Sequence, residues 1–350
     1  MQLDALRAPA RDLSSSVVVI TGASSGIGRA AALALAEAGA SLVLAARREE
    51  PLRDATRECE ERGGHALAVP TDMRDEAAVA RLADAAVERF GRLDVWVNNA
   101  AVTLFGRFEE TPADLWREVI EVNLFGYVNG ARAAIPHLRR DGGGTLINVG
   151  SVNSRLGAPY VSAYVTSKFA LRGFAECLRD ELRGEGVDVC TVMPASIDTP
   201  LFQHAANFTG RAAKPLRPVI RPERVAAAVV RCAKRPRREL IVGASGRQLV
   251  LMHALVPALF ERFMTRNVER EHFREESLGP TEGNLRAPMP EWTGVTGGWK
   301  QGDASPKGSG PARSAMTAGT AAAAGLLGVA AAMVVAATRD VVRSSGARSR

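Results

Sequence analysis

The chain has 350 residues, and 45 Lys and Arg against 38 Asp and Glu give it a formal net charge of +7. That length is enough for one large α/β domain with additional segments, or for two domains. The basic residues are spread along the chain, and no basic run carries interleaved aromatic side chains, so nucleic-acid binding is not expected. The 4 cysteines form no CxxC pair, which argues against a metal site or a disulfide framework.

A glycine-rich turn stands near the start of the chain. The apolar residues 17–20 predict a strand, residues 21–28 read TGASSGIG, and the Ala-rich residues 29–38 predict a helix. Glycines let the backbone turn tightly and approach a pyrophosphate, while the free N–H groups of a helix N-terminus receive its negative charge. The arrangement therefore predicts a dinucleotide site, against the alternative of an ordinary glycine-rich turn.

Two arginines follow the second predicted strand. This strand covers residues 41–46, and Arg47 and Arg48 stand at its end. In a dinucleotide-binding unit this point meets the adenosine ribose, where an acidic residue would bond the 2′-hydroxyl of NAD. Guanidinium groups instead suit a 2′-phosphate, through paired charge-assisted hydrogen bonds. The pair favours NADP(H), unless the arginines only open the polar helix predicted over residues 49–62.

The remaining elements continue the alternation of strands and helices. A third strand, 65–69, precedes Asp72, and Asp75 is the expected N-cap of a helix over 76–90. A fourth strand, 93–97, leads to a long helix over 112–138 that carries Asn123 among apolar neighbours. Strands at 145–149, 187–192 and 239–242 are separated by helices over 160–183 and 222–234. The pattern predicts an α/β fold with a Rossmann-type, doubly wound parallel sheet of about seven strands in three layers.

A serine, a tyrosine and a lysine form the candidate chemistry. Tyr164 and Lys168 are four residues apart on one predicted helix, so their side chains share a face. A free tyrosine has a pKa of about 10, and a neighbouring ammonium would lower it towards neutral pH. Ser151 lies just beyond a strand tip, where its hydroxyl can bond a carbonyl oxygen that gains negative charge. Tyr164 is therefore the candidate general acid or base.

These motifs, in this order and spacing, resemble the classical short-chain dehydrogenases/reductases over about residues 15–242. The resemblance implies a tetrad in which Tyr164 is the acid/base, Lys168 lowers its pKa and contacts the ribose, Ser151 stabilises the carbonyl and Asn123 holds a water. It implies hydride transfer between a nicotinamide and a carbonyl or carbinol carbon, with Asp72 at the adenine and Thr199 at the carboxamide. With the arginine pair included, the expected cofactor-binding residues are Gly22, Ser24, Ser25, Gly26, Ile27, Gly28, Arg47, Arg48, Asp72, Asn99, Ala100, Tyr164, Lys168, Pro194, Ile197 and Thr199.

Two alanines depart from the family pattern. Ala101 and Ala195 stand where the family usually has glycine, so each puts a methyl group near the expected cofactor path. Downstream, residues 201–218 leave a strand tip and are expected to form a mobile lid, in which Phe202 and Phe208 favour a small apolar carbonyl or alcohol substrate. A homo-oligomer is also expected. The alternative is a membrane-tethered NADP(H)-binding sensor or scaffold without turnover.

The last part of the chain lies outside the resemblance. Residues 246–266 predict a further helix, which either packs on the domain or a dimer partner, or lies in a membrane interface. Residues 267–313 lack periodicity and are expected to be a flexible linker. Residues 314–338 carry no charge and are a candidate transmembrane helix. The expected order is an arm (1–14), the catalytic domain (15–266), the linker, this helix and a basic tail (339–350), with the catalytic domain in the cytoplasm because residues 1–12 lack an apolar core.

Overall fold

The computed structural model describes residues 10–300, and a seven-stranded parallel sheet forms their centre. The strands lie in the order β10-β7-β6-β4-β1-β2-β3. This confirms the predicted Rossmann-type sheet. The strands are β1 (Val17–Thr21), β2 (Ser41–Ala46), β3 (His65–Pro70), β4 (Val95–Asn98), β6 (Gly144–Val149), β7 (Val187–Pro194) and β10 (Glu239–Val242).

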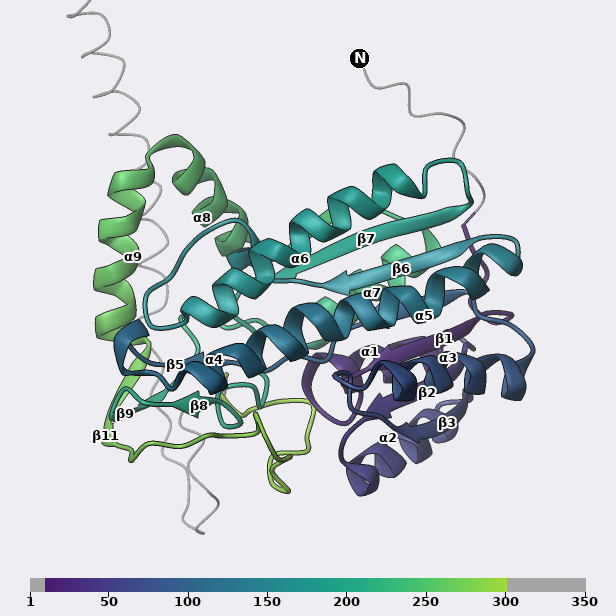
Figure 1. Ribbon diagram of the computed structural model, residues 1–350, viewed down its shortest axis with the longest axis horizontal. Coiled ribbons are helices and arrows are strands. Elements are labelled where there is room, and N and C mark those ends of the chain that lie inside the picture. Colours follow the sequence, from purple (N-terminus) through teal and green to yellow (C-terminus); the bar gives the residue numbers. More distant parts are fainter. Residues whose placement is uncertain (1–9, 301–350) are drawn as a thin grey trace, which may run out of the picture. The chain divides into compact units, whose positions relative to one another are not determined.

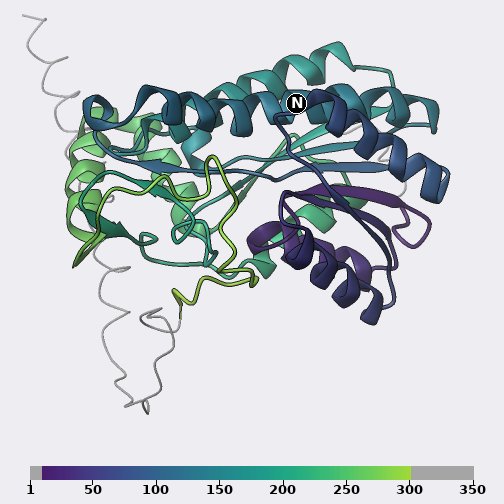
Figure 2. The same cartoon turned by 60° about the horizontal axis from the view of Figure 1, so that its bottom comes forward.

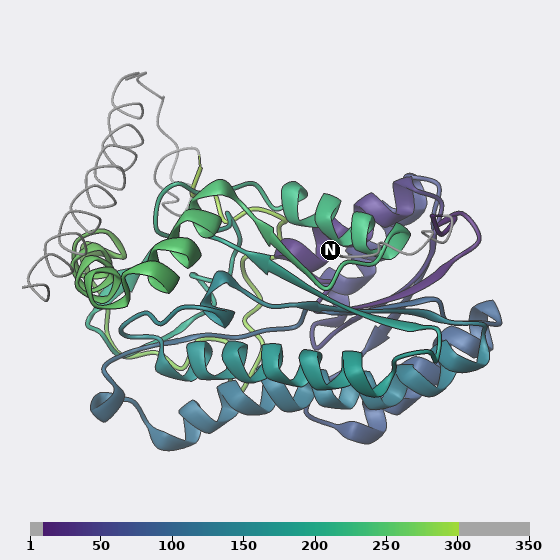
Figure 3. The ribbon, with the colours of Figure 1, turned by 90° about the horizontal axis from the view of Figure 1, so that it is seen from above.

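Helices cover both faces of this sheet, which gives the three predicted layers (Figure 3). One face carries α1 (Gly26–Glu37), α2 (Glu49–Glu61) and α7 (Glu223–Lys234), which share one apolar core with the sheet. The other face carries α3 (Glu76–Phe90), α5 (Gly126–Arg140) and α6 (Ser162–Glu181), which enclose a second core around the buried Trp96. Because both faces are covered, the central strands are apolar along most of their length.

The order of the strands places a crevice at the carboxyl ends of β1 and β4. From β1 the chain winds outward through β2 and β3, and it then returns to build the other half of the sheet from β4. Ligands of doubly wound sheets bind at such a switch point. The local signals agree with this winding: Asp75 caps α3 by accepting from the Ala78 N–H at 3.0 Å, as expected, and Gly91 ends that helix with a φ of +81°.

Additional elements lie around the carboxyl ends of the strands (Figure 1). Two small sheets form there, one from β5 (Leu104–Phe105) and β8 (Ala206–Asn207), the other from β9 (Arg211–Ala213) and β11 (Phe273–Ser277). Short 3₁₀ turns at Phe108–Glu110 and Val152–Ser154 lie between the longer elements. Helices α8 (Ala244–Leu255) and α9 (Pro257–Glu271) form a hairpin beside them.

Two helices differ from their predicted form. The helix expected over 112–138 consists of α4 (Ala113–Ile120), a π-helical turn at Glu121–Phe125 and α5. The helix expected over 246–266 is two helices, because Pro257 has no N–H to continue the first one and instead opens α9. The inner face of α9 is buried through Phe260, Met264 and Val268.

The expected flexible linker is wrong for residues 267–300. Here α9 continues to Glu271, β11 follows, and the chain then runs back across the carboxyl end of the sheet (Figures 1 and 2). Residues 281–300 form no helix or strand, but side chains from distant parts of the sequence bind their backbone. We call residues 281–300 the strap.

The boundary expected at residue 15 also differs. Leu13 is fully buried in the core beside α1, and the Arg11 guanidinium forms an ion pair with Asp94 at 3.2 Å. Residues 301–313, the candidate transmembrane helix at 314–338 and the basic tail lie outside the described residues. None of the helices in residues 10–300 combines the length and apolar character needed to cross a bilayer.

Candidate active site

The glycine-rich turn is locked against the end of β4. The Asn99 amide nitrogen donates to the carbonyl oxygens of Thr21 and Gly22, at 3.0 and 3.2 Å. Gly22 has a φ of +66°, a conformation that favours glycine. A Cβ on Gly28 would lie 2.2 Å from the Gly22 carbonyl oxygen, so no side chain fits where α1 passes under the turn. The turn is therefore a close-packed cradle whose outer residues line a pocket.

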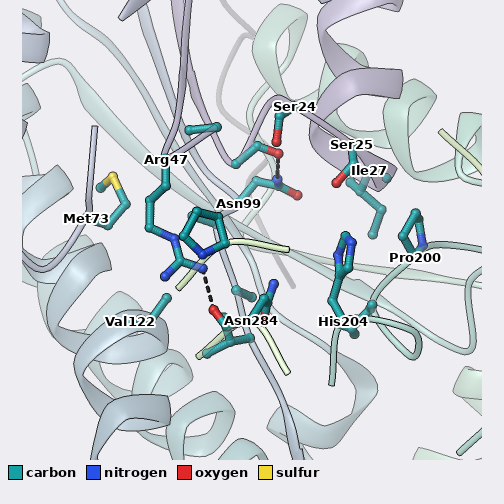
Figure 4. Close-up of a pocket in the computed structure, with 18 of the residues that line it drawn as sticks. Ser24, Ser25, Ile27, Arg47, Met73, Asn99, Val122, Pro200, His204 and Asn284 are labelled. Carbon is teal, nitrogen blue, oxygen red and sulfur yellow. Dashed lines mark hydrogen bonds between the residues drawn. The ribbon is translucent and has the colours of Figure 1, made fainter. Parts of the chain in front are cut away.

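A polar pocket extends over this cradle (Figure 4). It runs from the ends of β2 and β3 to the first turns of α6, along the carboxyl edge of the sheet. Gly28 lies behind the turn and does not line it, while Pro194 and Ile197 line a second pocket. The other predicted cofactor residues all line the polar pocket: Gly22, Ser24, Ser25, Gly26, Ile27, Arg47, Arg48, Asp72, Asn99, Ala100, Tyr164, Lys168 and Thr199.

The arginine pair lies at one end of the polar pocket. Arg48 donates to the hydroxyls of Ser24 and Ser25, at 3.2 Å each. Burial lowers the pKa of both Arg47 and Arg48, and the neighbouring arginines lower the pKa of Arg48 further. Within residues 10–300 no carboxylate lies at ion-pair distance from either guanidinium. Two half-buried cations without a carboxylate partner form a suitable receptor for an anion.

Asp72 lies near this end but already has a partner. Its carboxylate accepts hydrogen bonds from the Arg74 guanidinium, the shortest at 2.6 Å. Burial would raise the pKa of Asp72, but the hydrogen bonds from Arg74 outweigh it and hold the pKa below its usual value. The carboxylate is therefore ionised and fixed at the edge of the pocket.

The second pocket is mostly apolar. Its walls include Phe105, Leu156 and Phe202, and α9 contributes Met264 and Val268. Phe208, the other aromatic residue of the predicted lid, packs in a different apolar cluster. The two pockets share a boundary formed by Ile27, Gly150, Tyr164, Thr199 and Leu201.

Tyr164 stands at this boundary, beside Ser151. The Ser151 hydroxyl accepts from the Asn153 N–H at 3.1 Å, which makes Ser151 the N-cap of the 3₁₀ turn after β6. Burial raises the pKa of Tyr164, and a hydrogen bond with the Ser151 hydroxyl lowers it in part. The structure thus brings the predicted serine and tyrosine hydroxyls together.

Lys168 packs beside the Tyr164 ring and binds two other groups. Its ammonium donates to the Val149 carbonyl oxygen at 3.0 Å and to the Tyr127 hydroxyl at 3.4 Å. It lies 4.8 Å from the centre of the Tyr127 ring and 5.6 Å from that of Tyr164. Burial lowers the pKa of Lys168 to about 7. Burial is the largest influence on the pKa of both groups, and it moves them in opposite directions.

Asn123 braces the loop after β4. Its amide oxygen accepts from the Val102 N–H, and its amide nitrogen donates to the Val102 carbonyl and to the Ser167 hydroxyl, at 2.9, 2.9 and 3.2 Å. Both N–H groups of the side chain are therefore used. The residue lines neither pocket.

The comparisons with known proteins agree with this geometry. The family model described as "short chain dehydrogenase" matches residues 16–209. The chain is 39% identical over 276 residues to an uncharacterized oxidoreductase, YxnA, of Bacillus subtilis, with 78% of each chain covered. The chain belongs to the classical short-chain dehydrogenase/reductase family.

Further relatives and solved structures extend this family assignment. Dehydrogenase/reductase SDR family member 7B of Rattus norvegicus is 30% identical, with 76% of this chain and 85% of that protein covered. One solved structure is that of an alcohol dehydrogenase from the archaeon Thermococcus sibiricus, complexed with 5-hydroxy-NADP. It is 33% identical with a TM-score of 0.57, and the match covers 65% of this chain and 95% of that chain. A Mycobacterium marinum family member is 28% identical with a TM-score of 0.61, covering 67% and 96%.

Several residues of this short-chain dehydrogenase/reductase site were not predicted. Tyr127 accepts a hydrogen bond from Lys168. In the sequence, only its position one turn after Asn123 points to this role. His272 and the strap residues Asn284, Pro288 and Met289 line the pockets although they follow the family match. Neither of the two unusual alanines has a positive φ, and Ala101 lines the polar pocket. Ala195 packs against the positions of Gly243 and Gly246, which leave room for its methyl group.

Proposed function

We propose that the protein is an NADP(H)-dependent oxidoreductase that transfers hydride between the nicotinamide and a carbonyl or alcohol carbon of an apolar substrate. One observation carries this proposal: Tyr164 lines both the polar pocket and the apolar pocket, with the Ser151 hydroxyl beside it. A proton donor at the boundary between a dinucleotide site and an apolar site is what carbonyl reduction requires.

The polar pocket fits a dinucleotide with a 2′-phosphate. Gly28 has no room for a Cβ, and the turn above it offers its backbone to a pyrophosphate. At one end of the pocket, Ser24, Ser25 and the two arginines would hold the 2′-phosphate and Asp72 the adenine. At the boundary with the apolar pocket, Thr199 would meet the carboxamide. The absence of an ion-pair partner for Arg47 and Arg48 among the described residues supports NADP(H) over NAD(H).

The bound cofactor would supply or accept the hydride. For reduction, Ser151 would donate a hydrogen bond to the substrate carbonyl oxygen, and Tyr164 would give that oxygen its proton. Oxidation would reverse both steps. The raised pKa of Tyr164 keeps it protonated in the absence of the positive charge of an oxidised nicotinamide. Lys168 would contact the ribose, and Asn123 would hold the loop after β4 and bind a relay water through its backbone carbonyl.

The apolar lining of the second pocket supports a small apolar carbonyl or alcohol substrate. A homo-oligomer and a membrane association through residues 314–338, with a cytoplasmic catalytic domain, also belong to this proposal. Fractionation of cells expressing the full chain or a truncation ending at Arg313 tests the anchor, since only the full chain should require detergent for release.

The activity is tested by following NADPH consumption with a panel of aldehydes and ketones of increasing apolar size. We expect turnover that rises from acetaldehyde to bulky aryl or alkyl ketones. Mass spectrometry of ligands that copurify with the protein would then narrow the substrate. NADPH binding without consumption for every compound would instead favour the tethered sensor or scaffold.

A further inference from the structure

The strap crosses the carboxyl end of the sheet along the polar pocket (Figure 2). Its first part is anchored by Leu285, which is fully buried among apolar side chains of the loop after β4 and of α4. Three strap residues, Asn284, Pro288 and Met289, line the pocket opposite the glycine-rich turn. The strap therefore forms a wall of the site that the family motifs do not include.

Backbone carbonyls of the strap bind the cations of the site. Arg47 donates to the carbonyl oxygen of Asn284 at 2.5 Å (Figure 4). It also donates to that of Leu285 at 3.1 Å. Arg48 donates to those of Met289 and Glu291, at 2.9 and 3.0 Å. Arg47 uses two of its five N–H groups here, whereas Arg48, with its bonds to Ser24 and Ser25, uses four and keeps its Nε–H for a phosphate.

Two more carbonyls continue the contact along α1. The Thr293 oxygen accepts from Arg29 at 2.9 Å, and the Gly294 oxygen accepts from the Gly26 N–H at 3.1 Å. The strap thus follows the cleft from the arginine pair to the start of the helix.

Asp198 holds the far end of the strap. Its carboxylate accepts from the backbone N–H groups of Gly297, Trp299 and Lys300, at 3.0, 2.9 and 3.2 Å. The Trp299 indole also donates to the Thr199 carbonyl at 3.0 Å. Asp198 is only 3% exposed and lines neither pocket, so its carboxylate serves the strap.

Two glycines allow the strap to lie this close. A Cβ on Gly283 would be 2.3 Å from the His204 carbonyl oxygen, and one on Gly297 would be 2.5 Å from the Thr199 carbonyl oxygen. Gly294 is different, because the nearest atom to its Cβ would be 3.6 Å away. The strap is therefore fitted closely to the residues that follow β7, and it covers the polar pocket without filling it.

We propose that the strap closes over bound NADP(H) and slows its release, and that Asp198 is the residue that positions it. This inference rests on the proposed cofactor. A dinucleotide between the strap and the glycine-rich turn is enclosed on both sides, so release requires the strap to lift. The bonds to Asp198 and the contact at Gly297 resist that movement at the nicotinamide end.

The test measures NADPH affinity and release in the full chain, from nicotinamide fluorescence and stopped-flow displacement by NADP⁺. Gly297→Val should push the strap away from Thr199, because its side chain would overlap the Thr199 carbonyl oxygen. Asp198→Ala removes the carboxylate that accepts three hydrogen bonds from the strap backbone. Gly294→Ala is the matched control, since there is room for a methyl group at that position. We expect both strap variants to release NADPH at least about five-fold faster, with a dissociation constant raised in proportion, while the control matches the parent.

Hydrogen exchange provides a readout without turnover. NADPH should slow exchange of the strap amides in the parent chain and less so in Asp198→Ala, with unchanged exchange in β1 and β4 confirming that the fold persists. Release at the parent rate in both variants, or tighter NADPH binding than in the parent, would overturn the strap proposal alone. Failure of the parent chain to bind NADPH would overturn the proposed cofactor together with it.

Discussion

Lys168 is held by two tyrosine rings, and only one of them is the proposed acid. The Tyr127 hydroxyl accepts from its ammonium and itself donates to the Val149 carbonyl at 3.0 Å. An oxygen that accepts from an ammonium favours the charged lysine, so the hydroxyl opposes the burial that lowers the pKa of Lys168 to about 7. Tyr127 is therefore a positioning residue for the lysine.

Removing this hydroxyl should change the pH dependence of turnover. In Tyr127→Phe the charged form of Lys168 loses an acceptor, so its pKa falls further and the alkaline limb of the kcat profile moves to lower pH. The dissociation constant of NADPH should stay within about two-fold, because Tyr127 does not line the polar pocket. Tyr160→Phe is the matched control, since it removes a hydroxyl away from Lys168. An unshifted limb in Tyr127→Phe would refute this role.

The arginine pair is expected to discriminate between the two cofactors. Changing Arg47 and Arg48 to Ala removes the charge-assisted bonds to a 2′-phosphate, each worth about 1.5–3 kcal/mol, so the KM for NADPH should rise at least ten-fold more than that for NADH. Both values should also rise modestly through loss of the strap contacts. Arg53→Ala, an exposed arginine on α2, serves as the control. Equal effects on the two cofactors would sink the assignment of NADP(H).

At the scale of elements, the segment after β7 is the expected lid over the substrate. Phe202 lines the apolar pocket. Its ring packs against those of Phe105 and Trp299, with centroid separations of 6.2 and 5.9 Å. Burial of a phenyl ring is worth about 1.5–3 kcal/mol, so Phe202→Ala should raise the KM for a bulky apolar ketone roughly ten-fold and leave that for acetaldehyde nearly unchanged. Phe169→Ala, exposed on α6, is the control. Identical kinetics with both substrates would remove Phe202 from the binding site.

The end of α9 makes the stability of the fold depend on pH. His272 is packed against the Phe105 ring, with centroids 5.2 Å apart, and burial lowers its pKa from 6.5 to about 4. Between these two pH values the unfolded chain is protonated at this histidine and the folded chain is not. The part of the stability that depends on neutral His272 is therefore fully present above pH 6.5 and is lost as the pH falls towards 4.

This shift corresponds to a loss of up to ~3 kcal/mol, which urea unfolding at several pH values can measure. In His272→Gln the part of the pH slope due to this histidine should disappear, even if the variant is less stable overall. His65→Gln, at an exposed position, should keep the parent slope. A His272→Gln variant with the parent slope would show that His272 does not titrate in this way.

The elements that the sequence predicts well are those with local signals. The seven strands, the turn at Gly22 to Gly28 and the cap at Asp75 each depend on neighbouring residues, and all of them are present in the fold. Pro257 itself indicates the break between α8 and α9, whereas the π-helical turn at Glu121–Phe125 was missed as a boundary because the apolar periodicity continues through it. The spacing of Ser151, Tyr164 and Lys168 predicts that the three side chains lie close together. It does not predict that burial is the main influence on the pKa values of the tyrosine and the lysine.

At the scale of the whole molecule, the strap could not be predicted from local pattern. Its residues show no periodicity, and their partners lie far away in sequence: Arg47 binds Leu285 across 238 positions. The composition of a linker and that of an irregular but anchored segment are the same, and only the tertiary contacts distinguish them. The molecule thus combines a sheet built from local signals with an active-site wall built from long-range ones.

The central claim is that this fold places one proton donor, Tyr164, between a dinucleotide and an apolar substrate. The most direct test compares Tyr164→Phe with the parent chain in NADPH binding and in reduction of the best carbonyl compound of the panel. The account predicts NADPH affinity within about two-fold and a turnover number lower by about 10²–10⁴, the usual contribution of a general acid. Turnover at the parent rate in Tyr164→Phe would contradict it.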